Sequence, residues 1–136
     1  MKQRLKRGRT AMVVALAILL LPACSNTPEA DTEAWASALE EVPGVMTADV
    51  EFGSYGPGNH ADVIVRTDTD DSAELEKILR ESVTAFVEVT ADMDTFALDY
   101  SVRTADGTRA LYPEAIGWNT SPITFLREDV AAASGD

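Results

Sequence analysis

The 136-residue sequence has one cysteine, one histidine and few basic side chains. Because Cys24 has no partner, no disulfide can form within the chain, and the folded part must depend on its apolar core. No GxSxG, SxxK or paired Cys and His pattern occurs, so nucleophilic catalysis has no visible residues. A metal site needs three or four convergent ligands, and the spacing around His60 supplies none. We therefore expect no catalytic residue, no metal ligand and no cofactor, and we interpret His60 as a loop residue at the start of a strand.

A long hydrophobic run is also lacking. The apolar stretch at residues 11–21, AMVVALAILLL, has eleven residues and stops at Pro22, whereas a membrane-spanning helix needs about 20. It follows ten residues with five Lys or Arg and no acid, which is typical of the start of a secretory signal. The sequence therefore predicts an export signal and not a permanent transmembrane anchor.

The run ends with Leu21, Pro22, Ala23 and Cys24. These residues resemble the lipobox of bacterial lipoprotein precursors, with a leucine three residues before the cysteine and a small residue just before it. The resemblance implies that diacylglycerol alkylates the Cys24 thiol, that a signal peptidase cuts between Ala23 and Cys24, and that the new amino terminus is acylated. It also implies a lipid-anchored protein on the outer face of the cell membrane. The alternative is an ordinary cleaved signal that leaves Cys24 unmodified.

The charge balance excludes one class of partner. Residues 24–136 carry six basic and twenty-three acidic side chains, a formal net charge of −17. Such a surface repels nucleic acid phosphates and anionic headgroups, so we expect no nucleic acid partner. Aromatic side chains recur within periodic apolar segments, which disordered chains lack. Ala is abundant, and Asp and Arg outnumber Asn and Lys; this usage resembles that of small lipoproteins from high-GC actinobacteria.

Apolar spacing predicts two helices and four strands. Residues 31–42 have helical spacing that ends at Pro43 and Gly44, and a second, longer helix starts at a capping box of Asp71 and Glu74 and continues to residue 89. Strict alternation predicts two strands, at 46–52 and 60–67, on either side of the loop 53–59. A third strand is predicted at 96–102, and a fourth ends near residue 113. The turn at 106–107 then pairs two sets of residues: Val102 with Leu111, and Arg103 with Ala110.

This order predicts an α+β domain of two αββ units. We expect a four-stranded antiparallel sheet with two helices on one face, similar to a circularly permuted ferredoxin-like fold. The predicted division is a signal peptide at 1–23, a lipidated tether at 24–31, the domain at 32–118 and a C-terminal tail at 119–136. The helix-free face of the sheet is expected to carry Asp49, Glu51, Asp62, Ile64, Arg66, Asp99, Ser101, Arg103 and Tyr112.

The functional hypothesis is a lipid-anchored envelope protein with a non-enzymatic, acidic binding or scaffolding domain. Its expected partners are the membrane, through the N-terminal lipid, and an unknown envelope protein or ligand. Tyr112 and Trp118 are the candidate partner-binding residues, because aromatics outside the periodic core can mark an interface; the alternative is a tail folded over the sheet or a helix. Two other functions stay open: a small envelope hydrolase that uses carboxylates, and a binder of small ligands or cations.

Overall fold

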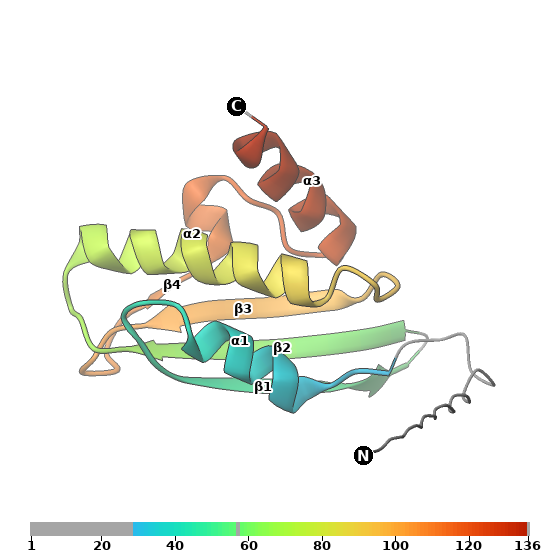
Figure 1. Cartoon of the computed structure of the whole chain (residues 1–136), viewed down its shortest axis with the longest axis horizontal. Coiled ribbons are helices and arrows are strands. Elements are labelled where there is room, and N and C mark those ends of the chain that lie inside the picture. The colour runs from blue at the N-terminus through green and yellow to red at the C-terminus, as the bar shows by residue number, and fades with distance from the viewer. Residues whose placement is uncertain (1–28, 57, 136) are drawn as a thin grey trace, which may run out of the picture.

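The computed structural model describes residues 29–56 and 58–135 (Figure 1). In chain order the elements are α1 (Thr32–Glu40), β1 (Val45–Tyr55), β2 (Gly58–Thr67), α2 (Ser72–Val89), β3 (Ala97–Arg103), β4 (Ala110–Leu111), the 3-10 helix η3 (Pro113–Ile116) and α3 (Ile123–Ser134). The predicted α+β class with a four-stranded sheet is confirmed. Ala23 and Cys24 lie outside the described residues. Within those residues, none of the helices is both long and apolar enough to cross a bilayer.

The sheet is mixed, so the prediction of an all-antiparallel sheet is wrong. The strand order is β1-β2-β3-β4. The hairpin pairs β1–β2 and β3–β4 are antiparallel, but β2 and β3 are parallel neighbours joined through α2. A helical crossover returns the chain to the same end of the sheet, which is how parallel neighbours are connected. This order departs from a permuted ferredoxin-like arrangement, in which another strand separates the two strands that a helix connects.

The first hairpin is longer than expected. β1 and β2 pair from Val45 with Thr67 as far as Tyr55 with Gly58, with one irregularity between Val45 and Thr47. Most of the predicted loop 53–59 is therefore strand. In the second hairpin the predicted register is confirmed, because Val102 pairs with Leu111 and Arg103 with Ala110.

The start of α2 uses half of the predicted capping box. The carboxylate of Asp71 accepts a hydrogen bond from the amide of Glu74 at 2.9 Å, as an N-cap does. The amide of Asp71 donates to the Thr69 hydroxyl at 3.0 Å, so the reciprocal bond from Glu74 is replaced. Asp71 thus has a structural role at the helix start.

One apolar core joins the helices to the inner face of the sheet. Alternate residues of β2 and β3 point into this core, and α1 and α2 cover it. Its centre is aromatic: the Trp35 ring lies 5.7 Å from Phe52 and 5.9 Å from Phe86, both edge to face. Because both helices use this face, no helix of residues 29–56 and 58–135 lies over the other face of the sheet (Figure 1).

The chain after residue 118 belongs to the same core, so the predicted boundary lies too early. Ile123, Leu126 and Val130 of α3 are buried in the core cluster. The amide of Ile123 donates to the Phe96 carbonyl at 2.9 Å, which fixes the start of α3 beside β3. Figure 1 shows α3 and η3 beside α2. The expected C-terminal tail is therefore a packed part of the domain.

Candidate functional site

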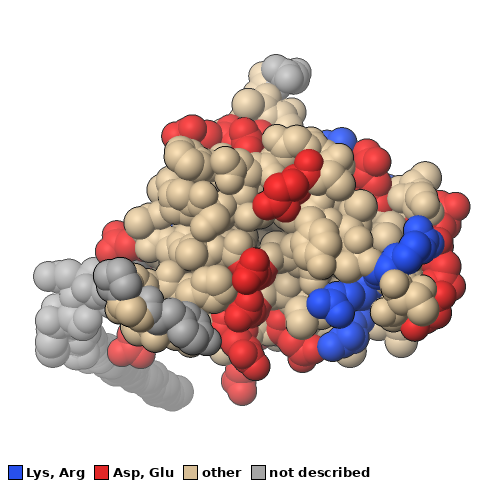
Figure 2. Space-filling model, turned by 180° about the vertical axis from the view of Figure 1, so that it is seen from behind, with Lys and Arg blue, Asp and Glu red and all other residues tan. Residues whose placement is uncertain are grey.

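The helix-free side of the sheet is the candidate site and is called the open face. Successive side chains of a strand point to opposite faces, so the partners of the buried residues point outward. Figure 2, which shows the molecule from behind, displays acidic side chains across the middle of this side and basic side chains gathered toward one edge. The open face comprises Asp49, Glu51, His60, Asp62, Ile64, Arg66, Asp99, Ser101, Arg103 and Tyr112.

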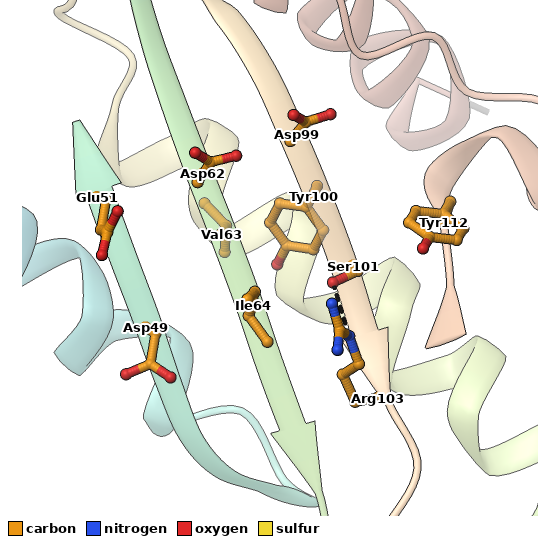
Figure 3. Close-up of a pocket in the computed structure, with 10 residues that line it drawn as sticks. All are labelled: Asp49, Glu51, Asp62, Val63, Ile64, Asp99, Tyr100, Ser101, Arg103 and Tyr112. Atoms are coloured by element: carbon orange, nitrogen blue, oxygen red, sulfur yellow. Dashed lines mark hydrogen bonds between the residues drawn. The ribbon is translucent and has the colours of Figure 1, made fainter. Parts of the chain in front are cut away.

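The open face contains a hollow of about 400 Å³. Eight of the nine residues expected on this face line it, which confirms the predicted alternation of β1, β2 and β3. Tyr112, which follows β4, stands beside β3 and forms one side of the hollow (Figure 3). The other lining side chains of the predicted set are Asp49, Glu51, Asp62, Ile64, Asp99, Ser101 and Arg103.

Strand register sorts the charges of the open face into two rows. Glu51 pairs with Asp62, and Asp62 pairs with Asp99, so three carboxylates lie in line across β1, β2 and β3. We call these three residues the acidic row. Toward the other end, Arg66 pairs with Arg103 across β2 and β3. The face thus has an acidic end and a basic end.

The basic end is partly neutralised by its own neighbours. Arg66 Nε lies 3.6 Å from Asp49 Oδ2, and both side chains are substantially exposed. Arg103 Nε donates to the Ser101 hydroxyl at 3.3 Å (Figure 3). The exposed pair of Arg66 and Asp49 contributes little to stability, about 0–1 kcal/mol. The Arg66 guanidinium therefore stays accessible to a ligand.

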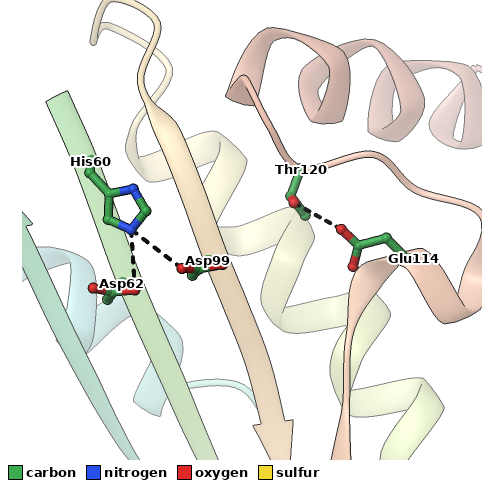
Figure 4. Close-up of polar contacts among 5 residues, drawn as sticks. All are labelled: His60, Asp62, Asp99, Glu114 and Thr120. Carbon is green, nitrogen blue, oxygen red and sulfur yellow. Dashed lines mark hydrogen bonds and ion pairs between the residues drawn. The ribbon is translucent and has the colours of Figure 1, made fainter. Parts of the chain in front are cut away.

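His60 stands at the acidic end and has two carboxylate neighbours. Its Nε2 atom lies 3.3 Å from Asp62 Oδ1 and 3.4 Å from Asp99 Oδ2 (Figure 4). The side chain of His60 is 25% exposed, against 43% for Asp62 and 78% for Asp99. His60 is the third residue of β2, so its interpretation as a loop residue is wrong, although it does lie near the start of a strand. A chelating nitrogen and two oxygens converge here on the protein surface.

The sequence could supply only part of this cluster. His60 and Asp62 are two residues apart on a strand, a spacing that places both on one face. Asp99 joins them because β3 runs parallel to β2 and aligns Asp99 with Asp62. That pairing was not predicted, so the third residue of the cluster was missed.

The two candidate partner-binding aromatics have different surroundings. Tyr112 is 51% exposed and lines the hollow, so its role in partner binding stays a prediction. Trp118 is 9% exposed and belongs to the core cluster, and the Arg80 guanidinium of α2 lies 5.7 Å from its ring centre. The alternative to an interface role was that the chain around Trp118 folds over the sheet or a helix. The position of Trp118 beside α2 agrees with this alternative.

Comparison with known proteins adds little to this geometry. No protein-family model matches the chain, and no curated protein matches it. A solved structure titled "MamM V260R" is 21% identical, covers 55% of this chain and 100% of that chain, and gives a TM-score of 0.39. That likeness is too low to support an argument about function. The open face must be interpreted from its own residues.

Proposed function

We propose that this chain is a lipid-anchored cell-envelope protein whose open face binds an envelope partner and performs no chemistry itself. The observation that carries the proposal is the helix-free sheet face, with its hollow of about 400 Å³ lined by charged and polar side chains. Ligand sites are concave and hold a few convergent polar groups. The lipobox resemblance at residues 21–24 supports the anchor.

The predicted tether would keep this face close to a bilayer. α1 starts at Thr32, and residues 24–31 reach at most roughly 25–30 Å when fully extended. The net charge of −17 for residues 24–136 would repel an anionic membrane surface over a Debye length of about 8 Å. The domain would therefore face a partner at the membrane and not insert into the lipid.

The exposure of the carboxylates favours binding over hydrolysis. Acid–base hydrolysis depends on one carboxyl group that a water-poor environment keeps protonated. Asp62 and Asp99 are 43% and 78% exposed, which leaves both in contact with water. A complementary partner instead carries a cationic group over the acidic row and an acidic or amide group near Arg103.

Detergent phase partitioning of the wild type and Cys24→Ser tests the anchor. We expect the wild type in the detergent phase and the variant in the aqueous phase, because acyl chains anchor at about 0.8 kcal/mol per buried methylene. Equal recovery of both proteins in the detergent phase would contradict lipidation at Cys24.

Site-specific crosslinking in living cells tests the open face. A photoreactive phenylalanine analogue replaces Tyr112, and the matched control replaces Phe125 on α3, which is also exposed but does not line the hollow. We expect one protein to be captured reproducibly from position 112 and not from position 125. Capture of the same proteins from both positions would contradict binding at the open face. A separate result would favour the hydrolase: the protein degrades an envelope polymer, and substitution of one Asp or Glu abolishes that activity.

A further inference from the structure

We propose that His60, Asp62 and Asp99 together bind one divalent first-row transition-metal ion, with Zn²⁺ as the reference ion. The inference rests on the proposed function, since it assigns a ligand class to the acidic end of the same open face. The three side chains offer one imidazole nitrogen and two carboxylate oxygens, all within 4.8 Å of one another.

The distances fit a single small ion. A tetrahedral zinc ion holds nitrogen and oxygen ligands at about 2.0–2.2 Å, which separates the ligand atoms by about 3.3–3.6 Å. The two measured separations from His60 Nε2 are 3.3 Å to Asp62 Oδ1 and 3.4 Å to Asp99 Oδ2. The third pair, between the two carboxylate oxygens, lies within 4.8 Å, and the Asp99 side chain, which is 78% exposed, has room to rotate toward the ion.

The strands hold the three ligands in fixed relation. His60 and Asp62 lie on one strand with one residue between them, and the parallel register places Asp99 beside Asp62. The residues that pair with His60 are small, Gly53 on β1 and Ala97 on β3. Neither of these neighbours carries a large side chain, and Figure 4 shows His60 directed toward both carboxylates. Ligands on paired strands are positioned more precisely than ligands on a loop.

The mixed ligand set selects the class of metal. Imidazole nitrogen suits Zn²⁺ and its first-row neighbours, whereas Mg²⁺ and Ca²⁺ prefer sites made only of oxygen. Glu51 pairs with Asp62 in the register, so the acidic row adds a further negative charge at this end of the sheet. Three protein ligands leave a coordination position for water or for a group of the partner. Where the ion is bound, it takes the place of the partner's cationic group over Asp62 and Asp99, and the partner offers a ligand atom to the ion instead.

An ion pair is the competing explanation for the same geometry. A protonated imidazole between two carboxylates also gives separations of 3.3 and 3.4 Å. A metal ion replaces that proton, because only the neutral imidazole binds it. Direct titration with metal separates the two explanations.

The experiment is a calorimetric titration of the full chain in detergent with Zn²⁺, and separately with Mg²⁺ and Ca²⁺. We expect one Zn²⁺ per chain and a loss of affinity of about tenfold or more in Asp99→Asn and in Asp62→Asn, as for altered metal shells. Asp49→Asn is the matched control, because it removes the same charge from the same face outside the cluster. Its affinity should stay within about twofold of the wild type, since Asp49 pairs with Ile64 and supplies no ligand atom to the cluster.

Three results would overturn the site: no saturable Zn²⁺ binding by the wild type, equal weakening by Asp49→Asn and Asp99→Asn, or Mg²⁺ or Ca²⁺ binding as tightly as Zn²⁺. Asp99 is 78% exposed, so its substitution leaves the core intact.

Crosslinking from position 112 is then repeated with wild type and Asp99→Asn in parallel. If both proteins capture the partner equally and the wild type does not bind Zn²⁺, the metal site is rejected and the proposed function stands. If the wild type binds Zn²⁺ but captures no partner, the metal site stands and the proposed function is rejected.

Discussion

Arg127 of α3 donates a hydrogen bond of 3.0 Å to the main-chain carbonyl of Thr90, the residue that caps the end of α2. The same Nη2 atom donates to the Met93 carbonyl, also at 3.0 Å. The last turn of α2 has no basic residue of its own, and Arg127, from a distant part of the chain, donates to the carbonyl of its C-cap residue. This contact couples α3 to the sheet–helix core through the end of α2.

Replacement of Arg127 should destabilise the whole domain. Arg127→Met keeps much of the aliphatic packing but leaves the two carbonyls without their charged donor. We expect the free energy of unfolding to fall by about 1.5–3 kcal/mol, the usual contribution of a hydrogen bond to a charged group. Urea denaturation followed by circular dichroism measures this change.

Lys77→Met is the matched control for loss of a positive charge. Lys77 forms an exposed i,i+4 ion pair with Glu81, 3.2 Å between Nζ and Oε2. Such pairs contribute about 0.3–0.5 kcal/mol. If both variants unfold at the same urea concentration, the contact between Arg127 and the end of α2 has no special structural role.

Gly44 marks a second position at which a small change should have a large effect. It joins α1 to β1 with a φ of +92°, and an added Cβ would lie 2.6 Å from Ile78 Cδ1 in the core. Gly44→Ala therefore combines backbone strain of about 1–2 kcal/mol with overpacking of about 1–3 kcal/mol. We expect the free energy of unfolding to fall by about 2–5 kcal/mol in the same urea assay.

Gly117→Ala separates these two causes. Gly117 also has a positive φ, +83°, but nothing lies within 4 Å of an added Cβ. Its substitution should cost only the backbone term, about 1–2 kcal/mol. Equal losses for the two variants would mean that the Ile78 side chain moves aside at no cost.

Local patterns in the sequence predicted elements and faces better than they predicted which elements become neighbours. Alternation identified the outward residues of β1, β2 and β3, and the turn at 106–107 fixed the β3–β4 register. Alternation is the same in parallel and antiparallel sheets that bury one face, so it could not reveal the β2–β3 pairing. α3 had a usable signal, because Ile123, Leu126 and Val130 follow helical spacing.

The candidate site shows the same limit. Asp49, Glu51 and Asp62 were assigned to the open face from alternation alone. The cluster around His60 depends on Asp99, thirty-nine positions further along the chain, and only strand order brings Asp99 beside His60. A site made from neighbouring strands cannot be assembled from spacing within one strand.

The turn between β3 and β4 provides a prediction about pH. Asp106 accepts hydrogen bonds from the Thr108 amide at 3.0 Å, the Thr104 hydroxyl at 2.7 Å and the Thr108 hydroxyl at 2.8 Å. These donors favour the charged carboxylate and lower the pKa of Asp106 from 3.8 to about 2, with the Thr108 amide as the largest cause. An NMR titration of the side-chain carboxyl carbon should show this value, and a midpoint near 3.8 would contradict the hydrogen-bonded turn.

The direction of the stability change follows from the lowered pKa. Because the unfolded chain takes up the proton near 3.8 and the folded chain only near 2, Asp106 stabilises the fold fully above about pH 4 and loses that effect as the pH falls toward 2. Asp106→Asn should therefore be less stable than the wild type at pH 5, and the difference should shrink at pH 2.5. Thr108→Val removes one hydroxyl donor but keeps the amide, so the pKa of Asp106 should rise only part of the way. A full return to the ordinary value in Thr108→Val would assign the shift to the hydroxyl and not to the backbone of the turn.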